Sequence, residues 1–159
     1  MTATALSSDT LELVSFHIGD MEVGIEVHKI QEINRDNDFI PVPHAPDAVR
    51  GVLNLRGEVV TTLDLRRLLG LPPAEITTES RNLVIAHQGE RIALLVDRIS
   101  DIVRVPTDQV EARPENFSDI EGKYFEGVCK LDGRLVAILH VEGTLSLEAI
   151  GLEDPETEG

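Results

Sequence analysis

The chain has almost no aromatic side chains and a single cysteine. Its 159 residues include four Phe, one Tyr and no Trp, so the core must be built from Val, Ile and Leu, which suits β-sheets better than an aromatic cofactor pocket. Because Cys129 has no second cysteine to join, no internal disulfide can form, and a reducing compartment fits the composition. Cys129 lies in an apolar segment, where we expect it to pack rather than to react.

Basic residues are also scarce. The chain has 14 Lys and Arg against 29 Asp and Glu, and its formal net charge is −15. We expect no nucleic-acid partner, because affinity for phosphate backbones comes from clustered Lys and Arg. An anionic membrane surface would repel such a chain, and no signal peptide or membrane-length apolar run is present. The composition therefore predicts a cytoplasmic protein that does not insert into a membrane.

Motifs for catalysis and cofactor binding are missing as well. None of the five histidines stands at the spacing of a zinc site, and no Cys-x-x-Cys, phosphate-binding glycine loop or G-x-S-x-G segment occurs. Asp97 and Asp101 flank an apolar segment, and we interpret both as solvated strand ends. The sequence predicts a protein that is not an enzyme and that uses no cofactor or metal.

The chain does contain an internal repeat. Residues 51–64 (GVLNLRGEVVTTLD) match residues 127–140 (GVCKLDGRLVAILH) without a gap, and residues 23–33 parallel residues 93–102. Duplicated small β units usually form two similar barrels. We therefore expect a junction between two barrels, with an apolar cleft there that binds another protein.

Short strands at hairpin spacing fill both halves of the sequence. Two-residue turns are predicted at three places, Arg56-Gly57, Gln88-Gly89 and Asp132-Gly133. The proline-rich segment 40–47 predicts an extended connection, and segment 71–80 predicts a linker. Because no long helix and no alternation of strands with helices appears, these features predict an all-β barrel or sandwich.

The segment 30–34 (IQEIN) predicts an irregular strand. Ile30 and Ile33 are three positions apart, so a regular strand with period two cannot place both on one face. A β-bulge, or a residue outside the strand, would resolve this conflict. For Ile30, Ile33 and their repeat partners Ile99 and Ile102, core packing is one interpretation and the floor of a groove with a charged rim is the other.

Arginines cluster within a short stretch of this acidic chain, at positions Arg50, Arg56, Arg66 and Arg67. Arg56 lies at a predicted hairpin tip, where it can pair with a carboxylate, and Glu32 is a candidate. Such a pair, if exposed, contributes only about 0–1 kcal/mol to stability. Its value would lie in fixing orientation.

Residues 51–66 (GVLNLRGEVVTTLDLR) closely resemble the GxxNLRGxxxxxxDLR segment of the bacterial chemotaxis coupling protein CheW family. Other blocks of the sequence agree with the family, namely residues 16–33, 41–51, 94–103 and 124–127. The similarity runs from about Leu11 to Leu147. The hairpin segment 87–97 is one residue shorter than is common in the family. A stand-alone coupling protein fits the chain better than the related CheA or CheV proteins, because there is no room for a kinase or receiver domain.

The resemblance implies an all-β fold of two SH3-like five-stranded barrels around a shared core, with short helical turns. It implies one domain over residues 11–147. The approximate first barrel spans 11–75 and the second 80–147, with a strand or helix crossing over at the ends. Residues 1–9 and 151–159 are expected to be flexible tails.

The resemblance also implies a non-catalytic adaptor at membrane receptor arrays. Its expected partners are the cytoplasmic tip of a methyl-accepting chemoreceptor, the regulatory domain of the CheA histidine kinase and other CheW copies in rings. The implied receptor-binding residues are Ile30, Ile33, Leu83, Val84 and Val103. Glu32 and Arg56 match a charged pair that bears on coupling. Two alternatives remain: a CheW-like scaffold of a non-chemotaxis pathway, and a small-molecule-binding β-barrel.

Overall fold

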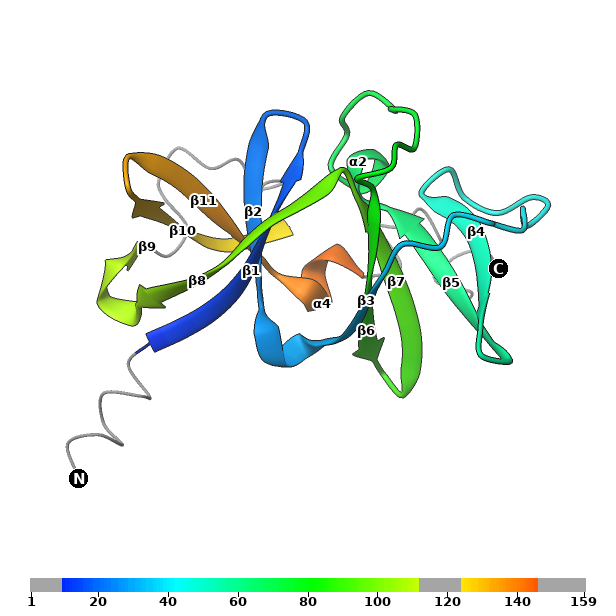
Figure 1. The fold of residues 1–159 in the computed structure, drawn as a ribbon, viewed down its shortest axis with the longest axis horizontal. Coiled ribbons are helices and arrows are strands. Elements are labelled where there is room, and N and C mark those ends of the chain that lie inside the picture. Colours follow the sequence, from blue (N-terminus) through cyan, green and yellow to red (C-terminus); the bar gives the residue numbers. More distant parts are fainter. Residues whose placement is uncertain (1–9, 112–123, 146–159) are drawn as a thin grey trace, which may run out of the picture.

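The computed structural model describes residues 10–111 and 124–145, and most of these lie in strands (Figure 1). The strands are β1 (Thr10–Ile18), β2 (Met21–Glu26), β3 (Ile30–Asn34), β4 (Val49–Leu55), β5 (Glu58–Asp64), β6 (Arg81–His87), β7 (Glu90–Val96), β8 (Arg98–Pro106), β9 (Val110–Glu111), β10 (Phe125–Leu131) and β11 (Arg134–Leu139). The helical turns are η1 (Val27–Lys29), α2 (Leu65–Leu68), η2 (Thr107–Gln109) and α4 (Val141–Thr144). Within the described part of the chain, no helix is long and apolar enough to traverse a bilayer.

Two expectations concern residues outside the described part of the chain. They are the flexible tails 1–9 and 151–159.

The strands form two sheets, as predicted for an all-β protein with two subdomains. Sheet A has the order β8-β1-β2-β11-β10-β9, and sheet B has the order β3-β6-β7-β5-β4. Sheet A therefore has a sixth, two-residue strand beyond the expected five. In Figure 1 the two sheets lie beside one another, with α2 and α4 near their junction.

The predicted barrel boundaries, 11–75 and 80–147, are wrong. The first hairpin of the chain, β1–β2, joins sheet A, and its strand β2 pairs in parallel with β11. Conversely, the hairpin β6–β7 joins sheet B, where β7 pairs in parallel with β5. The two halves of the repeat thus exchange their first hairpins. The sequence repeat identifies the hairpin units, but similar units offer similar pairing partners in either half.

The described residues form three apolar clusters, and the largest lies between the sheets. We call it the junction core; it includes Phe16 and Ile25 of sheet A together with Leu83 and Leu94 of sheet B, all fully buried. Smaller clusters lie on the other face of each sheet, one around Leu13, Cys129 and Ile138 in sheet A and one around Leu53, Val60 and Val84 in sheet B. The expected open cleft at the junction is therefore wrong for the described residues, because their own side chains fill it.

The three predicted two-residue hairpin turns are present. Arg56, Gln88 and Asp132 have φ angles of 54°, 53° and 49°, and the glycine after each also has a positive φ. Two successive residues in this left-handed region are typical of the turn whose twist matches paired strands, and glycine at the second position removes the steric cost. These turns set the register of β4–β5, β6–β7 and β10–β11.

Candidate docking surface beside the junction core

The first part of the candidate site is the edge strand β3. A register shift between Ile30 and Glu32 shows that a bulge, one of the two expected explanations, resolves the spacing of the isoleucines, and it places Ile30 opposite Ile85 and Ile33 opposite Leu83. Directly opposed residues of an antiparallel pair share a face, so both isoleucines lie on the face of the junction core. Ile30 packs against that core, and Ile33 is 45% exposed beside it.

The second part is β8, an edge strand of sheet A, whose pairing with β1 also contains a bulge. A register shift between Ser15 and Phe16 places Ile99 opposite Phe16 and Ile102 opposite Val14. Phe16 and Val14 belong to the junction core, Ile99 packs against it, and Ile102 is 58% exposed. Because Ile30 and Ile33 match Ile99 and Ile102 in the internal repeat, each half supplies one bulged edge strand with two isoleucines on the same face.

We call these four residues, Ile30, Ile33, Ile99 and Ile102, the isoleucine surface. Ile30 and Ile99 pack against the junction core, and Ile33 and Ile102 are exposed on the same two strands. In Figure 1, β3 and β8 lie on either side of the junction. An apolar surface held by two edge strands is suited to contact with another protein.

Three of the five residues expected to bind a receptor have their side chains directed elsewhere. Leu83 and Val84 are fully buried, because β6 is an inner strand whose alternation sends Leu83 into the junction core and Val84 into the sheet B cluster. Val103 lies opposite Leu13 and packs in the sheet A cluster. Its neighbour Ile102 takes the outward position. The repeat, which aligns Ile33 with Ile102, is the sequence signal that identifies this residue.

The third part of the site is a group of charges at the other face of β3. The predicted pairing of Arg56 with Glu32 is present: Arg56 Nη1 lies 3.3 Å from Glu32 Oε2, and Nη2 forms an ion pair with Oε1. Arg91 joins the same carboxylate, with Nη2 2.9 Å from Glu32 Oε1, and also pairs with Glu58. We call Glu32, Arg56, Glu58 and Arg91 the charged cluster. Glu32 and Arg56 were expected here from the sequence, whereas Arg91 and Glu58 were not.

The charged cluster holds Glu32 ionised. Hydrogen bonding from Arg56 lowers the pKa of the Glu32 carboxyl below its ordinary value, and it outweighs the opposing effect of desolvation. The same contact raises the pKa of Arg56. β3 therefore presents apolar side chains on one face and a fixed carboxylate on the other, which is the combination of apolar floor and charged rim that the sequence suggested.

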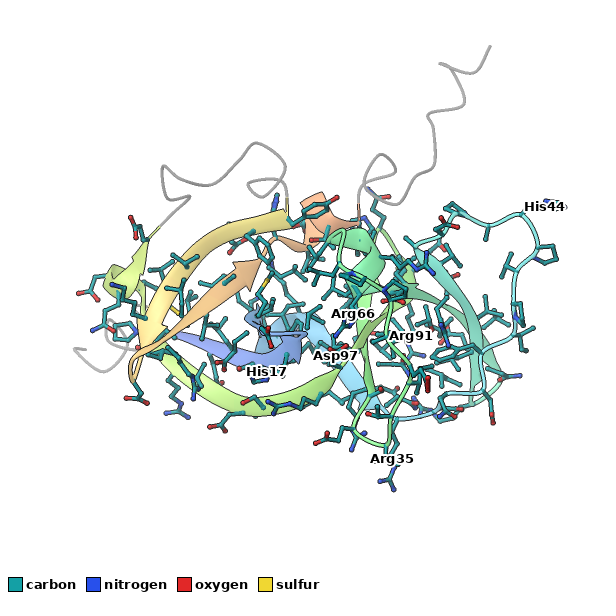
Figure 2. All side chains as sticks on the ribbon, turned by 90° about the horizontal axis from the view of Figure 1, so that it is seen from above. His17, Arg35, His44, Arg66, Arg91 and Asp97 are labelled. Carbon is teal, nitrogen blue, oxygen red and sulfur yellow. The ribbon has the colours of Figure 1, made fainter. Side chains whose placement is uncertain are left out.

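A second ion pair joins the two sheets at the junction (Figure 2). Arg66, on α2 after β5, lies with Nε 2.9 Å from Asp97 Oδ1 and Nη2 2.6 Å from Oδ2. The backbone N–H of Gly19, in the β1–β2 turn, donates to Asp97 Oδ2 at 2.8 Å, and the N–H of Asp97 donates to the carbonyl of His17 at 3.1 Å. Asp97 is thus a structural link between the sheets, and the solvated strand end expected from the sequence is wrong for this residue.

This link predicts a pH dependence of stability. Burial raises the pKa of Asp97, but the hydrogen bonds from Arg66 and Gly19 prevail and lower it below the ordinary value. A lowered folded-state pKa contributes stability that is present above the unfolded value and lost as the pH falls through the folded value. We expect Asp97→Asn to lower the free energy of unfolding by about 1–3 kcal/mol at pH 7 and by much less near pH 2. Urea unfolding of both proteins at the two pH values checks this, and a difference that does not change with pH would contradict it.

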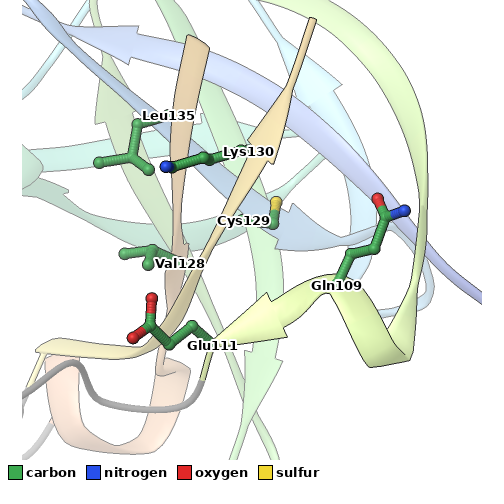
Figure 3. Close-up of a pocket in the computed structure, with 6 residues that line it drawn as sticks. All are labelled: Gln109, Glu111, Val128, Cys129, Lys130 and Leu135. Carbon is green, nitrogen blue, oxygen red and sulfur yellow. The ribbon is translucent and has the colours of Figure 1, made fainter. Parts of the chain in front are cut away.

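Among the residues that the structure describes, no group of three or more His, Cys, Asp or Glu is placed to hold a metal ion. Cys129 is buried as predicted, and burial, followed by the charge of Glu22, raises the pKa of its thiol. A pocket of about 510 Å³ lies at the far end of sheet A, lined by Gln109, Glu111, Val128, Cys129, Lys130 and Leu135 (Figure 3).

The fold and the site together define a two-sheet β protein of the binding and scaffolding class. The CheW-like domain model matches residues 12–149, and the chain belongs to this family. It is 34% identical over 144 residues to a probable chemotaxis protein CheW of Rhizobium etli, covering 89% of this chain and 92% of that protein. It is 32% identical over 146 residues to the chemotaxis protein CheW of Rhizobium meliloti, covering 92% and 94%. The crystal structure of the scaffolding protein TtCheW from Thermoanaerobacter tengcongensis has the same fold, with a TM-score of 0.80, 21% identity, and coverage of 87% of this chain and 94% of that one.

Proposed function

We propose that this protein is a chemotaxis coupling adaptor that binds the helical tip of a chemoreceptor on the isoleucine surface. The single observation that carries this proposal is the duplication of the isoleucine surface. Two bulged edge strands, one from each half of the chain, expose Ile33 and Ile102 beside the junction core. The family of chemotaxis scaffolds to which the chain belongs supports the same reading.

The binding mode would be an amphipathic helix laid on an apolar surface. Apolar side chains of the receptor helix would cover Ile33 and Ile102, contributing roughly 25 cal/mol per Å² before the costs of association. Because the junction is sealed, the helix would lie on the surface and would not enter a cleft. A small interface of this kind gives weak individual contacts, so strength would come from many copies in an array.

The adaptor role needs a second partner. We propose the regulatory domain of the CheA histidine kinase, with other copies of the chain as neighbours in rings at cytoplasmic receptor arrays. The protein would act by holding the receptor and the kinase in a fixed relation, without catalysis. Glu32 would flank the receptor contact, since it is the neighbour of Ile33 on β3, and Arg56 would do so through its ion pair with Glu32.

The direct test is co-sedimentation of the purified protein with a receptor signalling fragment and with a CheA regulatory domain, separately and together. The proposal predicts binding to each and a ternary complex when both are present. Failure to bind the receptor fragment at concentrations near 0.1 mM, above the micromolar range expected for such contacts, would refute the receptor assignment.

A further inference from the structure

The face of β7 from which the Arg91 side chain projects is set by the tight turn before this strand. The two-residue turn Gln88-Gly89 sets the register of β6 and β7, and it places Arg91 opposite Ala86. Arg91 therefore lies on the same face of β7 as Ala93, which belongs to the sheet B cluster, while Ile92 faces the junction core. A shift of one residue would turn the guanidinium toward the junction core.

The guanidinium of Arg91 joins three strands. Its Nε lies 3.1 Å from Gln31 Oε1 and its Nη2 lies 2.9 Å from Glu32 Oε1, both on β3, while Nη1 forms an ion pair with Glu58 on β5. Since the strand order is β3-β6-β7, Arg91 reaches past β6 to hold the edge strand. The planar fork of arginine suits such a multiple contact, and lysine could not reproduce it.

Arg56 holds the same carboxylate from a different position. Its side chain is 69% exposed at a hairpin tip, whereas that of Arg91 is 24% exposed between strands. An exposed side chain at a turn keeps more rotamer freedom than one held by acceptors on two strands. Arg91 therefore ties Glu32 to the inner strand β7, and Arg56, which contacts both oxygens of the same carboxylate from an exposed turn, is oriented by the position of Glu32.

We propose that Arg91 is a positioning residue of the docking surface, which holds Glu32 and, through it, orients Arg56 and the edge strand β3 for the receptor. This inference rests on the proposed function. Its physical basis is that a surface already ordered before binding loses less side-chain and strand freedom when the partner docks. Arg91 needs no contact with the partner to have this effect.

The test is a double-mutant cycle on receptor binding, with Arg91→Gln, Glu32→Gln and the double variant. We expect Arg91→Gln to weaken binding about three- to tenfold in the wild-type background and to have no further effect in the Glu32→Gln background. Arg67→Gln, an exposed arginine on α2, removes the same charge and should leave binding unchanged. Unchanged binding by Arg91→Gln, or equal weakening in both backgrounds, would overturn the proposal.

A titration of Glu32 by NMR in the free protein separates this inference from the proposed function. Removing Arg91 takes away a donor to Glu32, so we expect its carboxyl pKa to rise in Arg91→Gln and to stay unchanged in Arg67→Gln. If the wild-type protein binds no receptor fragment, the proposed function fails, and an unchanged Glu32 titration then rules out positioning by Arg91 as well. A raised pKa together with wild-type affinity would show that Arg91 holds Glu32 but that docking does not need it, which also overturns the proposal.

Discussion

Ile33→Glu is expected to remove receptor binding and leave the fold intact. Ile33 is 45% exposed on an edge strand, so a glutamate there can reach water and costs the fold little. Once a receptor helix covers the site, however, the carboxylate would be desolvated without a partner. Loss of the apolar contact of a central interface residue reduces the free energy of binding by about 2 kcal/mol or more. We therefore expect the affinity to fall by at least about 30-fold. Calorimetric titration with the receptor fragment measures this, and circular dichroism checks the fold.

Ile40→Glu is the matched control, because Ile40 is 57% exposed and lies on the connection between β3 and β4, away from the isoleucine surface. It makes the same exchange of residue and charge, and it should bind the receptor as the wild-type protein does. Equal loss of binding in both variants would mean that added negative charge, and not the isoleucine surface, decides the affinity.

Leu83→Ala is expected to destabilise the protein without altering the surface that binds the receptor. Leu83 is fully buried in the junction core, directly opposite Ile33. Truncating a buried leucine loses its transfer free energy and leaves a cavity, so the free energy of unfolding should fall by about 2–5 kcal/mol. Urea unfolding with unchanged slope measures the loss, and receptor binding by the folded fraction should equal that of the wild-type protein.

Ile33→Ala truncates the residue of β3 that is paired with Leu83 of β6, so the two variants can be compared directly. Because Ile33 is partly exposed, its truncation should change the free energy of unfolding far less than Leu83→Ala does, and it should weaken receptor binding instead. If Leu83→Ala weakened receptor binding while leaving stability unchanged, Leu83 would belong to the contact surface and the placement of the junction core would be wrong.

Local features of the fold could be predicted because they depend on neighbouring residues. The turns at Gln88-Gly89 and Asp132-Gly133 follow from the need for positive φ, and the bulge at Ile30 follows from the spacing of two isoleucines. The exchange of hairpins between halves could not be predicted, because β2 meets β11 across more than 100 residues of chain and the repeat makes either partner equivalent.

The residues expected at the site differ in where the fold places them. Ile33 and Glu32 lie on the edge strand β3, and Arg56 lies at a hairpin tip, where side chains reach the surface. Leu83 and Val84 lie on an inner strand that is covered on both faces. A strand's sequence gives alternation, yet it does not say whether a neighbouring strand or solvent covers a face. Arg91 was missed for the same reason, since its partners on β3 and β5 come together only through the order of strands in the sheet.

The most direct measurement is a methyl NMR titration of isoleucine-labelled protein with the receptor signalling fragment. The proposed contact predicts that the methyl resonances of Ile33 and Ile102 shift most, that Ile30 and Ile99 follow, and that exposed Ile40 stays in place. Shifts centred on Ile40, or none at Ile33 and Ile102 when binding is saturated, would contradict receptor docking on the isoleucine surface.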